Sequence, residues 1–260
     1  TIALSKPDTL TCKADTLTLL AQISPPNALP VWTTSGSGHI ASGDSTTTPA
    51  ITTAGIYTLT VTNPLNGCTT TAADTVVANQ IIPIASVLIP APVISCQQPQ
   101  VTLSGTGSST GVSFAYLWNG TGILSGNMTL TPTVNQAGTY TLLVTNTRNS
   151  CTATASLSVF ADATTVTAVA QVADTLDCLV KTTLLTSAGS TTGANIQYLW
   201  TTTNGQIMGN PANPSISAGL PGMYTLRVSN PLNGCSTTVS VTVLQNIQSP
   251  ALSIQPPAVL

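Results

Sequence analysis

Apolar and polar residues alternate along three similar stretches of the chain. Residues 57–63 read YTLTVTN, residues 140–146 read YTLLVTN and residues 224–230 read YTLRVSN, so Tyr, Leu and Val fall on one face each time. Alternation with a period of two is typical of a β-strand that is buried on one face. The three stretches therefore predict the same half-buried strand in three places.

A turn motif and a second alternating stretch follow each of these strands. The turns read NPLNGC at 63–68, NTRNSC at 146–151 and NPLNGC again at 230–235. Asn, Pro and Gly are turn residues, and in the later two copies alternation resumes directly after the turn. Each of these copies predicts a β-hairpin with a cysteine at the start of its second strand.

The cysteines show that the motif belongs to a tandem repeat. Cys12, Cys96 and Cys178 recur at intervals of 82 to 84 residues, and Cys68, Cys151 and Cys235 recur at 83 to 84. One Trp and then one Tyr lie between the early and the late cysteine of each unit, namely Trp32 and Tyr57, Trp118 and Tyr140, and Trp200 and Tyr224. We therefore predict repeats at 1–81, 82–163 and 164–247, with 248–260 as the first strand of a following repeat.

Each repeat contains further short strands separated by turns. An early strand is expected past the first cysteine, for example at 16–22, and a second strand carries the Trp. Seven or so short strands in about 83 residues, with turns every 8 to 12, are typical of an all-β sandwich. In such a sandwich the six Trp and Tyr residues are expected to form the cores.

Composition points to the outside of the cell. Charged residues make up 5% of the chain, against about 25% in ordinary soluble domains, and Thr and Ser occupy the positions where Lys and Glu are usual. This composition excludes a nucleic-acid-binding face, and no apolar run approaches the length of a membrane span. Six evenly spaced cysteines favour disulfides. The chain begins without Met and ends just before the next expected cysteine, so we interpret it as a window cut from a longer array.

The pattern of cysteine, VTL, YLW and AGTYTLLVTN, closed by a second cysteine, resembles a known repeat family. It is similar to the immunoglobulin-like and PKD-like repeats found in long arrays in secreted surface proteins of Bacteroidota, including gliding-associated adhesins. The resemblance implies three immunoglobulin-like β-sandwich domains joined end to end, serving as a stalk or fibre. The implied partners are flanking repeats of the same chain, with lateral self-association into fibres. In one respect the chain departs from antibody-type domains: its late cysteine comes eleven residues after the Tyr.

The cysteines allow two disulfide patterns. One pairs the two cysteines of each repeat. In an immunoglobulin-like sandwich, however, these cysteines lie at opposite ends of a strand of roughly 23 Å, whereas bonded Cα atoms lie within about 7 Å. The favoured pattern therefore joins neighbouring repeats as Cys12–Cys151 and Cys96–Cys235, and leaves Cys68 and Cys178 to bond flanking repeats.

The few acidic residues are not placed at random. Five of the seven Asp residues precede a hydroxyl residue in the tripeptides DTL, DST and DTV. The pattern resembles the O-glycosylation sequon of Bacteroidota, whose acceptor would be Thr9, Thr16, Ser45, Thr75 or Thr175. The alternative is that Asp before a strand satisfies the amides of a turn.

The sequence predicts no catalytic or metal site and no cofactor. A serine nucleophile needs a base held near it, and only His39, the one histidine, and the scattered Asp residues could serve. There is neither Asp-x-Asp nor Cys-x-x-Cys. We therefore expect a structural segment of an extracellular filament or adhesin stalk rather than an enzyme. Two alternatives stay open: a glycan- or surface-binding module using loops 33–44 or 201–213, and a spacer within a secreted multidomain enzyme.

Overall fold

The computed structural model describes residues 1–253, and every regular element in this range is a β-strand. The predicted strand at 248–260 lies partly outside the described residues. The chain divides into two compact units. The first comprises Thr1–Pro92 and Thr102–Val159, and the second comprises Val93–Val101 and the chain from Phe160 onward.

The first unit opens with a sandwich of two three-stranded sheets. One sheet has the order β4-β7-β8 and the other β2-β6-β5, while β1 pairs with β3. The strands are β1 (Ile2–Leu4), β2 (Leu17–Thr18), β3 (Ala21–Ile23), β4 (Leu29–Ser35), β5 (Ile40–Ser42), β6 (Ala50–Ile51), β7 (Gly55–Thr62) and β8 (Thr69–Val76). The early strand predicted at 16–22 is therefore two short strands, because Leu19 and Leu20 leave the ladder and Leu19 donates its amide to Pro49 O.

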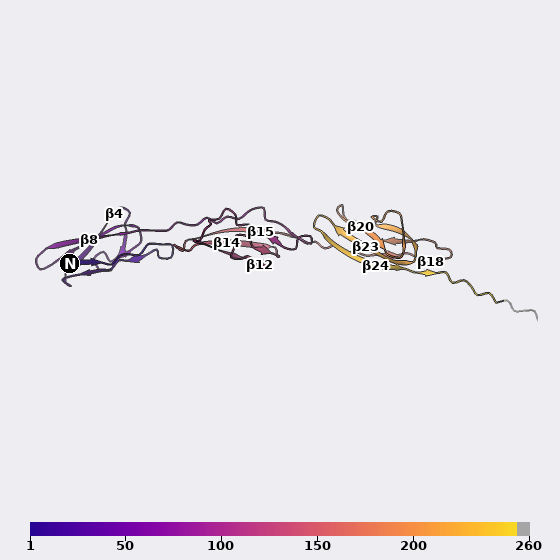
Figure 1. The fold of residues 1–260 in the computed structure, drawn as a ribbon, viewed down its shortest axis with the longest axis horizontal. Helices are drawn as coiled ribbons and strands as arrows, with labels where there is room; N and C mark the ends of the chain where they lie inside the picture. Colours follow the sequence, from indigo (N-terminus) through magenta and orange to yellow (C-terminus); the bar gives the residue numbers. More distant parts are fainter. Residues whose placement is uncertain (254–260) are drawn as a thin grey trace, which may run out of the picture. The chain divides into compact units, whose positions relative to one another are not determined.

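The same unit contains a second sheet of the same kind, in which β14 pairs with β11 and β15. Figure 1 labels β14 and β15. A separate pair of strands, β12 and β13, is joined with a shift of register. The strands are β10 (Val101–Thr102), β11 (Phe114–Asn119), β12 (Ile123–Ser125), β13 (Thr133–Val134), β14 (Gly138–Asn146) and β15 (Thr152–Val159), with β10 at the border between the units.

The second unit repeats the arrangement with the sheets β20-β23-β24 and β17-β19-β22-β21. Two short parallel pairs, β9 with β16 and β18 with β25, complete it. The strands are β9 (Ile94–Ser95), β16 (Ala161–Asp162), β17 (Gln171–Val172), β18 (Leu176–Asp177), β19 (Thr183–Thr186), β20 (Gln197–Thr202), β21 (Gln206–Met208), β22 (Ser215–Leu220), β23 (Gly222–Asn230), β24 (Cys235–Val243) and β25 (Gln245–Asn246).

The aromatic residues of the repeat pattern lie in the cores. All six are at most 4% exposed: Trp32, Tyr57, Trp118, Tyr140, Trp200 and Tyr224. Each Tyr hydroxyl donates to the carbonyl four residues upstream, as Tyr57 does to Thr53 at 2.7 Å. This bond is the tyrosine corner of immunoglobulin-like folds. The chain is thus an all-β tandem array of immunoglobulin-like sandwiches.

Candidate functional site

Two disulfides connect cysteines of successive repeats. Cys12 bonds Cys151 and Cys96 bonds Cys235, each with a Cα–Cα distance of 4.9 Å. Each bond lies within one compact unit, the first in the first unit and the second in the second. They are the two pairs named by the inter-repeat hypothesis. Cys68 and Cys178 are unbonded and exposed in the part of the chain that the structure describes.

The late cysteine of each repeat ends a six-residue turn, which we call the cysteine turn: 63–68, 146–151 and 230–235. Its first Asn accepts the amide of the residue two positions on, as does its second Asn. Its fifth residue has a positive φ of 71° at Gly67, 58° at Ser150 and 73° at Gly234. Asn side chains and a left-handed residue therefore build the same turn three times.

The second Asn of the turn also reaches across the joint between repeats. In the first joint, Asn149 Nδ2 donates to Asn79 Oδ1 and to Ile81 O, both at 3.0 Å. In the second joint, Asn233 Nδ2 donates to Asp162 Oδ1 at 3.1 Å and to Thr164 O at 3.2 Å. Both Asn residues are 1% exposed. One amide side chain thus holds its own turn through Oδ1 and the neighbouring segment through Nδ2.

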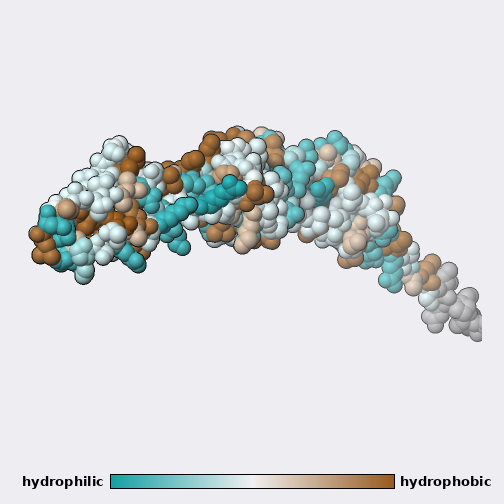
Figure 2. Space-filling view, turned by 60° about the vertical axis from the view of Figure 1, so that its left-hand side comes forward, coloured by the Kyte–Doolittle hydropathy of each residue, from teal (hydrophilic) through white to brown (hydrophobic). Residues whose placement is uncertain are grey.

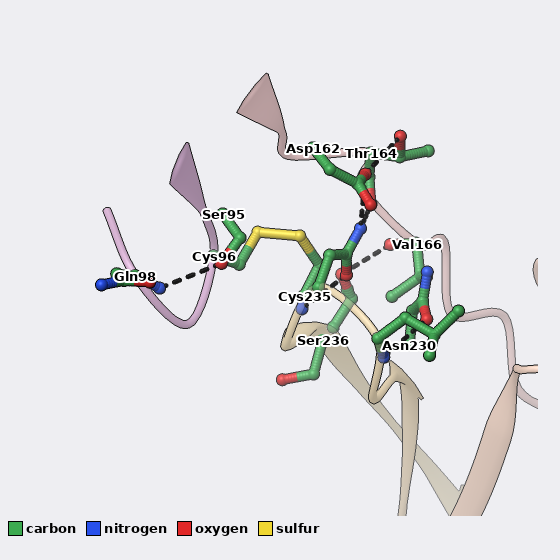
Figure 3. Close-up of a disulfide and its surroundings, with 12 residues drawn as sticks. Ser95, Cys96, Gln98, Asp162, Thr164, Val166, Asn230, Cys235 and Ser236 are labelled. Atoms are coloured by element: carbon green, nitrogen blue, oxygen red, sulfur yellow. Dashed lines mark hydrogen bonds between the residues drawn. A yellow bond between two sulfur atoms is a disulfide. The ribbon is translucent and has the colours of Figure 1, made fainter. Parts of the chain in front are cut away.

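The early cysteine of each repeat lies on a tight turn of its own. The turn is formed by the residue directly before the cysteine, which is Thr11, Ser95 or Asp177. This residue donates its backbone amide to the carbonyl of the residue three positions on, and its side chain accepts the amide of that same partner. Figure 3 shows the second of these turns, where Ser95 bonds Gln98 beside the Cys96–Cys235 disulfide. Side-chain bonds of this kind present the cysteine at the tip of the turn.

A short parallel bridge ties each early cysteine to the segment that leaves the same repeat. Leu10 bridges Ala78, β9 pairs with β16, and β18 pairs with β25. The residue two before each cysteine is buried, with Leu10 at 1%, Ile94 at 7% and Leu176 at 1% exposure. We call this assembly of early-cysteine turn and departing segment the exit end. The bridges place the early cysteine beside Asn79, Asp162 or Asn246, which occupy equivalent positions.

Two aspartates that are not part of the tripeptides DTL, DST and DTV, Asp162 and Asp177, lie in the exit ends. The hydrogen bond from Asn233, with a second from Thr164, holds the pKa of the Asp162 carboxyl below its ordinary value. The backbone amides of Val180 and Leu179 do the same for the pKa of Asp177. Both carboxyls are therefore favoured in their ionised, accepting form. In the first joint a neutral side chain, Asn79, occupies the position of Asp162.

The other candidate residues are exposed. The five hydroxyl residues of the Asp-containing tripeptides, Thr9, Thr16, Ser45, Thr75 and Thr175, are all exposed. Weakly polar residues, white in Figure 2, cover much of the visible surface, with apolar residues in brown among them. His39 is exposed, and its Nδ1 lies 3.1 Å from Thr52 Oγ1. No cluster of three metal-ligating side chains occurs within residues 1–253.

One hollow lies along the predicted binding loop 33–44. It has a volume of about 540 Å³ and is lined by residues that include Thr33, His39 and Asp44. Trp32 borders it but is only 4% exposed and donates Nε1 to Thr46 O. The Trp ring is therefore a core residue and offers no open face for stacking.

Sequence reasoning identified the cysteines but missed the side chains that align them. The local pattern predicts Asn149 and Asn233 only as turn residues, and it assigns no role to the residue before each early cysteine. A signal was present in both cases. An Asn precedes every late cysteine by two positions, and Thr, Ser or Asp precedes every early one.

No family model and no curated protein matches the chain. Solved structures of tandem immunoglobulin domains do match. The N-terminal eight Ig domains of Down Syndrome Cell Adhesion Molecule isoform 1.30.30 are 11% identical, with a TM-score of 0.36 over 95% of this chain and 37% of that one. Sidekick-1 domains 1–5 are 14% identical, with a TM-score of 0.30 over 94% and 57%. Three domains of the bacteriophage RB49 Hoc capsid protein are 15% identical, with a TM-score of 0.33 over 96% and 99%.

The chain thus spans less than two thirds of the first two of these structures. Likeness at this level supports no argument about function, and the fold assignment rests on the strands and cores described above. Within residues 1–253 there is no helix long and apolar enough to cross a membrane.

Proposed function

We propose that the chain is a structural repeat segment of a long extracellular filament or adhesin stalk, in which disulfides staple neighbouring sandwiches into a rigid spacer. The observation that carries the proposal is the joint itself. In both joints a disulfide and two hydrogen bonds from one buried Asn connect successive repeats. A joint with one flexible linker bends freely, whereas a joint with a second, covalent connection resists bending. Cys68 and Cys178 would continue the same pattern to flanking repeats.

Digestion without reduction tests the staple. Trypsin together with a protease that cleaves before Asp separates all six cysteines, because a cleavage site lies between every neighbouring pair. After free thiols are blocked, we expect a peptide containing Cys12 joined to one containing Cys151, and Cys96 joined to Cys235. A peptide joining Cys96 to Cys151 would refute the staple and the rigid spacer with it.

The source of the chain and its glycosylation are tested on native material. We propose that the chain comes from a Bacteroidota-type surface protein and that Thr9, Thr16, Ser45, Thr75 and Thr175 carry O-linked glycans, which would supply the solubility that so few charges cannot. Electron micrographs should show fibres with an axial repeat of about 40 Å, the length of one sandwich and its linker. Intact mass should exceed that of the polypeptide. Compact particles would contradict the filament, and a mass equal to that of the bare polypeptide would contradict the glycosylation.

The hollow at residues 33–44 favours one alternative, a module that binds glycans or a surface. Its hydroxyl, imidazole and carboxylate groups match the hydrogen-bonding chemistry of sugars. Binding of the chain on a glycan array, lost in His39→Ala and Asp44→Ala, would favour this alternative over a purely structural segment. A spacer within a secreted enzyme is distinguished by the sequence of the parent gene.

A further inference from the structure

The cysteine turn at 63–68 has no partner among residues 1–253, yet it has the geometry of the two occupied turns. Gly67 donates its amide to Asn63 O at 2.8 Å, as Ser150 does to Asn146 O at 2.8 Å. Asn66 Oδ1 accepts the amide of Cys68 at 3.1 Å, against 3.0 Å in each occupied turn. The turn therefore reaches its binding conformation without a partner, so little order has to be gained on docking.

A bound partner shields the Asn and Cys of the cysteine turn from solvent. In the occupied turns the second Asn is 1% exposed, and Cys151 and Cys235 are 0% and 2% exposed. Asn66 and Cys68 are both exposed, and within residues 1–253 Asn66 Nδ2 has no hydrogen-bond partner. The two occupied turns thus serve as an internal comparison, because in each of them the residues equivalent to Asn66 and Cys68 bind the neighbouring repeat.

A hollow lies beside the unoccupied turn. It has a volume of about 170 Å³ and is lined by Asn63, Cys68, Thr70 and neighbouring residues. Thr237 is the equivalent of Thr70, and its Oγ1 donates to Val166 O at 2.6 Å. In the second unit this position is therefore filled by the segment that leads in from the exit end.

The partner surface that fits this turn is present on the same chain. At the third exit end, Cys178 is exposed at the tip of the turn that Asp177 forms with Val180. β18 and β25 place Asn246 where Asn79 and Asp162 lie in the occupied joints. Asn246 Oδ1 accepts one hydrogen bond, from the amide of Gln248 at 3.3 Å. The Gln248 carbonyl corresponds to those of Ile81 and Thr164.

We propose that the cysteine turn at 63–68 is a recognition site for the Cys178 exit end of a second copy of this chain, so that copies join head to tail. Asn66 Nδ2 donates to Asn246 Oδ1 and to the Gln248 carbonyl of the second copy, and this contact brings the two thiols together. The inference rests on the proposed stapled joint and names its recognition element, an Asn amide opposite an Asn or Asp acceptor.

A small disulfide such as oxidised glutathione serves as the oxidant. The Cys68 thiolate attacks it, forms a mixed disulfide and releases one glutathione thiolate. The Cys178 thiolate of the second copy then attacks the Cys68 sulfur and releases the second glutathione. Two protein thiols are oxidised and one glutathione disulfide is reduced to two thiols, so atoms and electrons balance.

Mixing two single-cysteine variants tests the proposal. Cys178→Ser keeps only the Cys68 thiol, Cys68→Ser keeps only the Cys178 thiol, and both keep the two joint disulfides. In glutathione buffer we expect the mixed dimer to exceed each homodimer by about tenfold or more, as selective pairing requires. A ratio of about two to one, the value for random thiol collision, would overturn the proposal.

Asn66→Asp in the Cys178→Ser background tests the amide. Asp keeps the oxygen that accepts the Cys68 amide but replaces the Nδ2 donor with a second acceptor. We expect the yield of mixed dimer to fall about tenfold. The matched control is Asn119→Asp, at an exposed position of β11, which should leave the yield unchanged. An equal yield from Asn66→Asp would refute the recognition element.

Peptide mapping of the same samples separates this inference from the proposed function. If Cys12–Cys151 and Cys96–Cys235 are found but the mixed dimer does not form selectively, only the head-to-tail recognition fails. If those two pairs are absent, the stapled spacer fails, whatever the dimers show.

Discussion

Replacing Asn149 with Leu should weaken the first joint and leave the second unchanged. The substitution removes the two hydrogen bonds from Nδ2 to Asn79 and Ile81. At about 1 kcal/mol for each bond, the assembled joint loses about 2 kcal/mol. Ile81 is 74% exposed and Asn79 is half-buried, so water can replace the donor that these two residues lose. The buried Cys151 amide also loses its acceptor, Asn149 Oδ1, so about 2 kcal/mol is the lower end of the expected loss.

The loss is measurable as a redox equilibrium. A joint that assembles less often brings Cys12 and Cys151 together less often, so the equilibrium constant for forming their disulfide should fall by about 30-fold or more, because 1.4 kcal/mol corresponds to tenfold. Titration with reduced and oxidised glutathione, followed by peptide mapping, reports both pairs in one sample. The Cys96–Cys235 pair is the internal reference.

Two matched variants complete the test. Asn233→Leu should produce the reverse pattern, weakening Cys96–Cys235 and sparing Cys12–Cys151. Asn66→Leu removes the same side chain from the turn that has no partner in the described part of the chain, so it should leave both pairs unchanged. If Asn149→Leu shifts both pairs equally, or neither, then the amide does not align the cysteines and our reasoning about the joint is wrong.

Three further predictions concern the turn, the second joint and the cores. Ser150→Gly should stabilise the first joint by about 1 kcal/mol, because a left-handed φ of 58° is strained for Ser and free for Gly. Gly234→Ser should destabilise the second joint, because a Cβ there would lie 2.5 Å from Gln97 Cβ. Thermal unfolding measures both effects. The Asp162 pKa is lowered in the folded state, so its contribution is complete above the ordinary Asp pKa of about 3.9 and is lost as the pH falls through the lower folded pKa. The side-chain amide resonance of Asn233 should follow this loss, while Asp162→Asn, which copies Asn79, should abolish the pH dependence; an unchanged titration in that variant would contradict the assignment. Tyr57→Phe removes the hydrogen bonds to Thr53 and His39 and should lower the free energy of unfolding by about 1 to 2 kcal/mol. Faster amide exchange in β7 would report this loss. Thr58→Val, on the outer face of the same strand, is the control.

Much of the fold follows from patterns that act over a few residues. The strand at 57–63 was predicted from its alternation, and β7 ends at Thr62 because Asn63 begins the turn. The predicted strand at 16–22 was wrong as one element, because its partner changes along its length: Leu17–Thr18 pair with β6, whereas Ala21–Ile23 pair with β1. Pro49 accepts the amide of Leu19 at the break and has no amide to donate in return. Leu19 is buried, and the strand breaks there. Alternation shows that a strand exists more reliably than it shows where the strand is interrupted.

The recognition element was outside the reach of local patterns. Asn149 and Asn66 occupy the same position of two similar turns, NTRNSC and NPLNGC, and make the same bonds within them. Only a segment some 70 residues away distinguishes them, since Asn149 meets Asn79 and Ile81 across the first joint. An isolated six-residue motif contains no information about what approaches it.

The repeat period follows directly from the spacing of the six cysteines, and most strands and turns follow from side-chain alternation and turn chemistry between near neighbours. The tertiary structure decided which cysteines meet. Cys12 and Cys151 are separated by 139 residues, as are Cys96 and Cys235. Their approach depends on the parallel bridge that holds each early cysteine at the exit end of its own repeat, and on the amide that spans the joint. Both are contacts between segments far apart in the chain, and only folding brings them together.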